Sequence, residues 1–300
     1  MFNKYFSKVV IGTWSLSGDL GFVSKKNVIS TIEACVENNF LEFDTAPTYG
    51  KGSVYKVLKD VLKNVNGVKI NTKCGYNSHF VKTFKIQDII DSIDNSLHVF
   101  KKINTLFLHN PRNEIKEWSK LFNILNAYKK KNFINSIGIS FARDCYFEKK
   151  IMNQFDYFQD EINLMRPQSV DFLSSFKAKL MARSPLASGC LSGNLNINSK
   201  FSKNDYRSSW LNDKARLKNI LFQIDQLKKI FPRNLRAMSK FFLLQNKNIS
   251  KVIFGIKNPS HIKELKKDIN SIQSINKSQI MKLHHLFESN FKLPKNTYGY

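Results

Sequence analysis

Residues 43–50, Phe-Asp-Thr-Ala-Pro-Thr-Tyr-Gly, join the end of a predicted strand to a loop that carries a phenol. The apolar run 39–43 is typical of a short buried strand that ends in the carboxylate of Asp44. Pro47 and the glycine at the end of the stretch then break the chain into a loop. Asp44 and Tyr49 could therefore face one pocket, although this stretch alone is a weak signal.

Two later runs repeat this pattern. Residues 68–73 form a strand-like run that ends in Lys73, and residues 105–109 form another that ends in His109. Ligands bind at the C-terminal ends of parallel strands in barrels and in open sheets alike. Three neighbouring strands that each end in an ionisable group therefore predict a site. Its candidate members are Asp44, Tyr49, Lys73 and His109.

Strand-like runs alternate with helical patterns along the whole chain. Eight such units, with no linker and no break in composition, predict a single α/β domain over residues 1–300, a (β/α)₈ TIM barrel. Ser24 is the predicted N-cap of the first helix. Predicted strands lie near residues 9–11, 39–44, 68–73, 105–109, 133–138, 155–159, 178–182 and 252–254. Later helices are expected near residues 54–62, 86–100, 212–230 and 234–246, after residues 111 and 259, and at 278–289.

Two segments do not follow the alternation. Residues 187–210 are rich in Gly, Ser and Asn without periodicity, which predicts a long loop of the kind that is usually functional or mobile. The C-terminal helix and tail, residues 278–300, follow the last barrel unit. This loop and the tail near Tyr298 and Tyr300 are expected to set the substrate, which the motifs do not specify. They do not specify the oligomeric state either.

The composition favours a globular protein in the cytoplasm. Hydrophobic residues make up 42% of the chain and aromatic residues 13%, which is typical of a packed core. No apolar run approaches the roughly 20 residues that span a bilayer, and the N-terminus reaches a strand too soon for a signal peptide. The 4 cysteines are widely spaced, so reduced thiols and no metal site are expected.

The charge raises a second hypothesis. The formal net charge is +25, from 48 basic and 23 acidic residues, and clustered basic residues can neutralise nucleic-acid phosphates. The lysines are instead scattered along predicted helices. The densest run, residues 129–131, lies where a helix is expected to end, and cations there suit the helix dipole. We interpret the charge as solvated helix faces and expect no nucleic-acid partner.

Short motifs in a fixed order resemble those of the aldo-keto reductase family. The matching pieces are residues 12–14, 43–46, 49–50, 72–75, 108–109, 138–140, 159–163, 184–186 and 252–255, and they cover roughly residues 8–270. Any one motif is poor support, whereas the ordered set is strong. The resemblance implies a (β/α)₈ barrel, a nicotinamide cofactor and an Asp–Tyr–Lys–His tetrad that reduces an aldehyde, ketone or sugar carbonyl to an alcohol.

The tetrad has a chemical rationale of its own. A phenol near its reference pKa of about 10 is a poor acid at neutral pH. An ammonium about 4 Å away at an effective dielectric constant of 20 contributes at most roughly 4 kcal/mol, which could lower the phenol pKa by up to about three units. We therefore expect Tyr49 to be the general acid, with Lys73 tuning it, Asp44 holding Lys73, and His109 orienting the carbonyl oxygen. Taken singly, each residue has an ordinary structural explanation.

The resemblance also implies residues that hold the cofactor. Ser140 and Gln159 match positions that bind the carboxamide, and Ser184 and Leu186 match a loop over the pyrophosphate. Lys257 could pair with a 2′-phosphate or be an ordinary surface lysine, so NADP(H) is preferred and NAD(H) is possible. The remaining expected cofactor residues are Gly12, Thr13, Arg183 and Gly255.

The chain departs from the family at several positions. Phe141 replaces an Asn, so one carboxamide contact is expected to be lost, and Arg183 replaces a Tyr that stacks on the nicotinamide. Arg183 could stack in its place and penalise the cationic oxidised ring, or it could pair with a phosphate or carboxylate. The other departures are Val54, Tyr55, Asn104, His261 and Leu265.

Two main function classes remain open at this stage. The first is an NAD(P)H-dependent carbonyl reductase, for which the complete tetrad argues. The second is a cofactor-binding regulatory subunit with little turnover. A regulatory chain need not keep all four tetrad groups, so we expect the enzyme.

Overall fold

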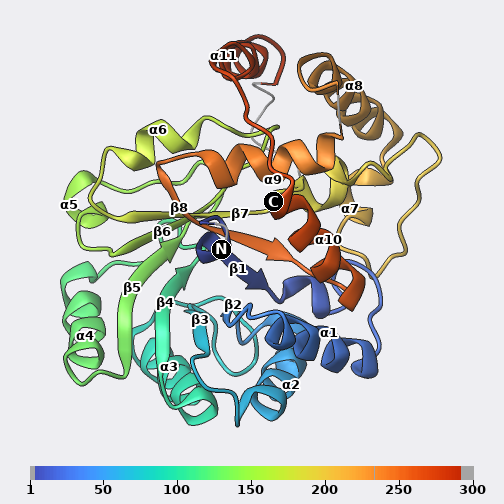
Figure 1. The fold of residues 1–300 in the computed structure, drawn as a ribbon. Coiled ribbons are helices and arrows are strands. Elements are labelled where there is room, and N and C mark those ends of the chain that lie inside the picture. Colours follow the sequence, from blue (N-terminus) through green and yellow to red (C-terminus); the bar gives the residue numbers. More distant parts are fainter. Residues whose placement is uncertain (1–3, 233, 292–300) are drawn as a thin grey trace.

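The computed structural model describes residues 4–232 and 234–291 and contains a closed barrel of eight parallel strands. Each strand pairs with its neighbours in chain order, and β8 closes the barrel against β1 (Figure 1). The strands are β1 (Val9–Gly12), β2 (Glu42–Asp44), β3 (Lys69–Cys74), β4 (Ile103–His109), β5 (Ile134–Ser140), β6 (Tyr157–Glu161), β7 (Lys179–Arg183) and β8 (Ile249–Gly255). The predicted (β/α)₈ architecture is confirmed.

Helices surround this barrel and cover the outward side chains of its strands (Figure 1). They are α1 (Lys25–Glu37), α2 (Ser53–Leu62), α3 (Ile86–Phe100), α4 (Trp118–Lys130), α5 (Lys149–Met152), α6 (Ser169–Ser174), α7 (Ser208–Leu211), α8 (Lys214–Ile230), α9 (Leu235–Gln245), α10 (Pro259–Asn270) and α11 (Lys277–Leu286). Ser24 caps α1 as predicted, because its side chain accepts a hydrogen bond from the amide of Asn27. Helices α8 and α11 pack on each other outside α9 (Figure 1).

Three segments differ from the sequence-based expectation. The segment 187–210 was expected to lack regular structure, which is wrong at its two ends, a 3₁₀ turn at Ala187–Ser192 and α7. Helices α5 and α6 span only 4 and 6 residues, too few to show a period. Helix α11 ends at Leu286 and is followed by a π-helical turn, Phe287–Phe291. Tyr298 and Tyr300 lie outside the described residues.

The barrel interior is filled in layers. Val10, Phe107, Met181 and Ile253 form a buried apolar cluster of their own within the barrel. Gly138 makes room for it, since a Cβ at that position would lie 2.5 Å from the Phe107 ring. Side chains on a strand alternate between its two faces, so the inward residue two positions after this layer points to the open C-terminal end. The functional side chains occupy that next layer.

Polar side chains close the opposite end of the barrel. Glu42 accepts hydrogen bonds from Asn71 Nδ2 at 3.0 Å and from Lys251 Nζ at 2.7 Å. Asn104, one of the departures from the family, donates to Asn71 Oδ1 at 2.8 Å and so joins this network. Because buried polar groups need partners, this network stabilises the barrel floor. Its position on the N-terminal side of the apolar layer separates it from the C-terminal end.

Val54 and Tyr55 also gain a structural explanation. Both side chains of this pair on α2 are buried. The Tyr55 hydroxyl contacts the hydroxyls of Thr72 on β3 and Ser96 on α3, and its ring meets Phe100 edge-on with centroids 4.9 Å apart. The residues therefore join α2, α3 and β3 through the core.

No helix in the described part of the chain is long and apolar enough to cross a bilayer.

Candidate active site

One cavity of about 630 Å³ opens at the C-terminal end of the barrel. It runs from the four predicted tetrad side chains to the start of α10. Every predicted site residue except Thr13 lines it, and these are Gly12, Asp44, Tyr49, Lys73, His109, Ser140, Gln159, Arg183, Ser184, Leu186, Gly255 and Lys257. Residues that are up to 245 positions apart in the chain therefore meet in one place, because the strands that carry them end side by side.

Asp44 and Lys73 form a buried ion pair in the wall of this cavity. Lys73 Nζ lies 2.6 Å from Asp44 Oδ1 and also donates to the carbonyl of Thr45 at 2.9 Å. Burial acts to lower the pKa of Lys73, but Asp44 and Tyr49 outweigh it and raise that pKa above its ordinary value. The ammonium therefore stays charged at neutral pH, as its predicted role requires.

Tyr49 lies against this pair, with Lys73 Nζ 5.0 Å from the centre of its ring. Burial raises the pKa of the Tyr49 phenol above the ordinary value of 10.0, and the opposing effect of Lys73 is smaller. The expectation that Lys73 would bring this pKa below its ordinary value is therefore wrong for the structure as it stands. Because protein atoms enclose much of the phenol, the cost of desolvating a phenolate exceeds the gain from the ammonium.

His109 is held between two aromatic rings. Its ring centroid lies 6.3 Å from that of Tyr49 and 5.2 Å from that of Tyr76. Burial, together with the positive charges of Lys73 and Arg183, lowers the pKa of His109 well below 6.5. The imidazole is therefore neutral at physiological pH, and a neutral ring can donate one N–H hydrogen bond.

Ser140 and Gln159 meet on the cavity wall beside the ion pair. Ser140 Oγ donates to Gln159 Oε1 at 2.9 Å, and Gln159 Nε2 donates to Asp44 Oδ2 at 2.8 Å. A hydroxyl and an amide in this position fit a primary carboxamide, which needs both a donor and an acceptor. Phe141 turns into the core against Tyr146, with ring centroids 5.1 Å apart. Its apolar ring offers no polar atom to a carboxamide, in line with the contact expected to be lost.

The chain after β7 has an unusual backbone. Ser184, Ala187, Ser188 and Gly189 all have positive φ angles, between 47° and 97°. The amides of Ala187 and Gly189 donate to Ser184 O and Leu186 O, at 2.9 Å each, so the turn is held by its own backbone hydrogen bonds. The segment lines the cavity.

Two loops meet across the far part of the cavity. The amide of Tyr206 donates to Asp19 O at 2.7 Å, and Lys257 Nζ donates to Leu20 O at the same distance. Arg207 donates to Leu20 O as well, at 3.0 Å, while pairing with Asp205 at 2.6 Å. Lys257 thus belongs to an ionic group that joins the loop after β1 to the segment 187–210. Burial, followed by repulsion from Arg207, lowers its pKa.

Three predicted cofactor residues have structural contacts of their own. Thr13 is fully buried, and its amide and hydroxyl both donate to Asp44 O, at 3.0 and 3.1 Å, so it braces β2. Gly12 passes so close to Ile253 that a Cβ would lie 2.7 Å from its Cγ2. Arg183 Nη2 donates to Phe141 O at 3.2 Å, and its Nη1 lies 3.9 Å from Glu161. Arg183 has therefore taken the carboxylate-paired arrangement while still lining the cavity.

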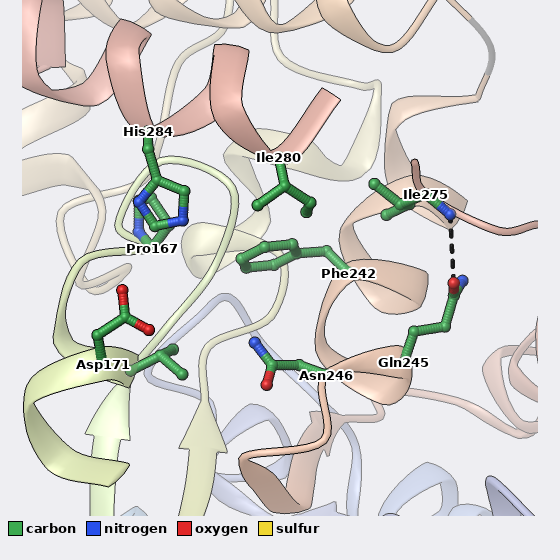
Figure 2. Close-up of a pocket in the computed structure, with 9 residues that line it drawn as sticks. Pro167, Asp171, Phe242, Gln245, Asn246, Ile275, Ile280 and His284 are labelled. Atoms are coloured by element: carbon green, nitrogen blue, oxygen red, sulfur yellow. Dashed lines mark hydrogen bonds between the residues drawn. The ribbon is translucent and has the colours of Figure 1, made fainter. Parts of the chain in front are cut away.

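A second cavity of about 290 Å³ lies between α6, α9 and α11 (Figure 2). Phe242 and Ile280 face one another across it, and His284 and Asp171 lie at its edge. One wall is fixed by Gln245, whose Oε1 accepts from the amide of Ile275 at 3.2 Å (Figure 2). None of the predicted site residues lines it, so the tetrad cavity remains the candidate active site. Within the described residues, no group of three or more His, Cys, Asp or Glu side chains could hold a metal ion.

The fold and site define an oxidoreductase-like (β/α)₈ barrel with a polar tetrad at the C-terminal strand ends. Residues 8–286 match the model of the aldo/keto reductase family, so the chain belongs to that family. Members of this family use nicotinamide cofactors to act on small-molecule carbonyl compounds.

Individual relatives are distant. An uncharacterized oxidoreductase, YcsN of Bacillus subtilis, is 26% identical over 208 residues, which are 61% of this chain and 68% of that protein. The glycerol dehydrogenase AKR11B4 from Gluconobacter oxydans superposes with a TM-score of 0.76 at 20% identity, over 96% of this chain and 93% of its own. The aldo-keto reductase AKR11C1 from Bacillus halodurans superposes with a TM-score of 0.73 at 16% identity, over 93% of this chain and 91% of its own. At these identities the two structures show a shared fold.

Three site features were not found in the sequence. Tyr76 packs on His109 from a loop whose tip folds back through a bridge between Tyr76 and Lys82. Arg207 and Asp205 lie in the segment 187–210, which was singled out only as a whole. A loop has no period that marks an inward residue, so these contacts had no signal beyond the segment's length.

Proposed function

We propose that this chain is a carbonyl reductase that prefers NADP(H) and converts an aldehyde, ketone or sugar carbonyl to an alcohol. The observation that carries the proposal is the buried Asp44–Lys73 pair, at 2.6 Å, with Tyr49 against it on the cavity wall. The His109 ring meets that of Tyr49 edge-on, with centroids 6.3 Å apart. Tyr49 as the proton donor, Lys73 as the neighbouring cation and His109 as a neutral hydrogen-bond donor thus line the same part of the cavity.

The protein residues act on the carbonyl oxygen. A bound reduced nicotinamide supplies the hydride that the carbonyl carbon accepts. Negative charge then develops on the oxygen, and Tyr49 donates its proton there. The positive charge of Lys73 stabilises the phenolate left behind. Asp44 holds the ammonium in place and keeps it charged.

The raised pKa of Tyr49 suits this direction of reaction. A phenol whose pKa is above its ordinary value keeps its proton at neutral pH and is ready to donate it. An alkoxide is a much stronger base than a phenolate, so transfer remains downhill. His109, kept neutral by burial, can donate an N–H to the same oxygen and fix its position.

The rest of the cavity suits the cofactor. Ser140 and Gln159 hold the carboxamide, and the segment 184–189 takes the pyrophosphate. Lys257 lies just before the N-cap of α10, whose N-terminus favours anions through its dipole. A 2′-phosphate at this point would be attracted by both, and it would relieve the repulsion between Lys257 and Arg207. This arrangement supports the NADP(H) preference.

The test is cofactor oxidation across a panel of carbonyl compounds. Purified protein is mixed with NADPH or NADH and with aldehydes, ketones and sugars, and absorbance at 340 nm is followed. We expect turnover with at least one class, and faster turnover with NADPH at low cofactor concentration. Tight cofactor binding with no turnover on any compound, together with a stable protein partner, would instead establish the regulatory function.

A further inference from the structure

Arg183 occupies the last inward position of β7, directly beside the carboxamide site. In the register of β6 with β7 it lies opposite Glu161, and Met181, two positions earlier, lies opposite Gln159. Its side chain is 16% exposed and lines the cavity together with Ser140 and Gln159. The hydrogen bond from Nη2 to Phe141 O fixes the guanidinium there. A nicotinamide ring held at Ser140 and Gln159 would therefore lie beside this cation.

The carboxylate nearest to Arg183 is shared. Glu161 Oε2 lies 3.2 Å from Arg143 and 3.9 Å from Arg183, and Arg143 is the more deeply buried of the two. Burial acts to raise the pKa of Glu161, but Arg183, Arg143 and Arg166 together lower it. Glu161 is therefore ionised, and its single negative charge is divided among several guanidinium groups.

The next carboxylates are engaged by other side chains. Asp160 accepts a hydrogen bond from Tyr146 at 2.9 Å, and burial raises its pKa while the charge of Arg183 opposes that rise. Asp144 is paired with Arg166 at 2.9 Å. Arg143 holds Glu161 more closely than Arg183 does, and Arg183 is the one of the two that lines the cavity. The charge of Arg183 acts on both Tyr49 and His109, so its field reaches the tetrad.

We propose that Arg183 determines which oxidation state of the nicotinamide cofactor the protein binds more tightly, by penalising the oxidised ring. This inference rests on the proposed function. When hydride leaves the neutral reduced ring for the carbonyl carbon and Tyr49 protonates the oxygen, the ring becomes a cation. The positive charge of Arg183 repels that cation and leaves the reduced ring unaffected. The oxidised cofactor is therefore bound more weakly and released more readily than the reduced cofactor.

The expected effect is about tenfold in the ratio of the two dissociation constants. That ratio corresponds to about 1.4 kcal/mol, or about 30 mV for a two-electron couple. The effect depends on charge, so Arg183→Lys should keep the ratio, whereas Arg183→Met should shift it about tenfold toward the oxidised form. Glu161→Gln removes the counter-charge and should shift the ratio the other way.

The experiment measures dissociation constants of NADPH, NADP⁺, NADH and NAD⁺ by calorimetry for the wild type and these three variants. Arg166→Met is the matched control, because it removes a guanidinium of the same group that does not line the cavity. Its ratio should stay within about twofold of the wild type. The shift should be the same for the phosphorylated and the unphosphorylated pair, since the nicotinamide is common to both. Circular dichroism establishes that each variant is folded.

An unchanged ratio in Arg183→Met overturns the inference. Equal shifts in Arg183→Met and Arg183→Lys also overturn it, since the cause would then be packing. If Arg183→Met does not fold, Glu161→Gln decides: a ratio that stays the same or moves toward the oxidised form overturns the inference. A protein that binds none of the four dinucleotides overturns the proposed function as well, so the two failures are distinguishable.

Discussion

Two buried ionic groups face each other across the cavity, and they differ in stoichiometry. On β2 and β3, one carboxylate meets one ammonium at 2.6 Å, and both side chains are almost wholly buried. On β6 and β7, Glu161 is shared by Arg143 at 3.2 Å and Arg183 at 3.9 Å. A closed pair fixes the geometry of its neighbour, here Tyr49. A shared carboxylate is the arrangement on which our proposal for Arg183 rests, so the two groups would serve different purposes.

The largest expected effect comes from removing the phenol that the closed pair positions. Tyr49→Phe should lower kcat for carbonyl reduction by about 10²- to 10⁴-fold, the usual range for positioned acid catalysis. Cofactor affinity should change little, because the phenol acts on the substrate oxygen. Steady-state kinetics and cofactor titration measure both quantities.

Tyr128→Phe is the control for this variant. It removes a phenol hydroxyl that bonds only to Asp94 on the outer surface, at 2.6 Å. Its kcat should match the wild type. A Tyr49→Phe protein that keeps over half the wild-type kcat would remove Tyr49 from the mechanism.

Breaking the closed pair itself should cost stability. Lys73→Met leaves the Asp44 carboxylate buried without its ammonium, and removing one partner of a buried pair usually costs about 3–5 kcal/mol. We expect a loss of that size in the free energy of unfolding, measured by urea denaturation.

The control is Lys120→Met, which breaks the exposed pair with Glu117, whose side chains are 60% and 62% exposed. Exposed pairs contribute at most about 1 kcal/mol. If Lys73→Met and Lys120→Met lowered the free energy of unfolding by the same amount, the contrast between buried and exposed pairs would not hold in this protein.

A third ionic group, Lys257 with Arg207 and Asp205, lies at the far end of the cavity, where we expect the 2′-phosphate of the cofactor to bind. Lys257→Met should weaken NADPH binding by about 1.5–3 kcal/mol, the usual range for a hydrogen bond to a charged group, and should change NADH binding much less. Titration with both cofactors measures this difference. Lys266→Met removes a lysine of α10 that bonds to Asn38 instead, at 2.9 Å, and should leave both affinities unchanged. Equal losses for NADPH and NADH in Lys257→Met would exclude Lys257 as the residue that reads the 2′-phosphate.

The smallest expected effect is that of pH. Tyr49 must be protonated for reduction, and its pKa lies above 10.0, so the proton is lost only in strongly alkaline solution. His109 must be neutral, and its pKa lies well below 6.5, so it is protonated only in acid. The rate kcat/KM for reduction should therefore be flat between about pH 7 and 9. A decline on lowering the pH through 6.5 would show that His109 titrates at its ordinary value. Alcohol oxidation needs the phenolate and should instead rise with pH.

The contrast between these groups also shows where sequence patterns stop being informative. Asp44, Lys73 and His109 each end an apolar run, and strand ends of a parallel barrel must lie together, so their meeting could be predicted. Ser140 ends β5 in the same way, whereas Gln159 lies in the middle of β6 and was expected from the family resemblance. The polar network of Asn71 and Asn104 had no such signal, because it lies at the start of the strands.

The sequence by itself therefore determined the barrel and the residues that gather at its open end. Strand-like and helical runs alternate along the chain, and the residue at the end of each strand-like run can be read from the local pattern. Only the tertiary structure decided the pKa direction of Tyr49, since burial and the Lys73 charge act in opposite directions and their balance depends on depth. It also decided that Arg183 shares Glu161 with Arg143 and that Lys257 and Arg207 both donate to the carbonyl of Leu20. Such partnerships join loops and strands far apart in the chain, where charge and distance are set by packing rather than by any sequence period.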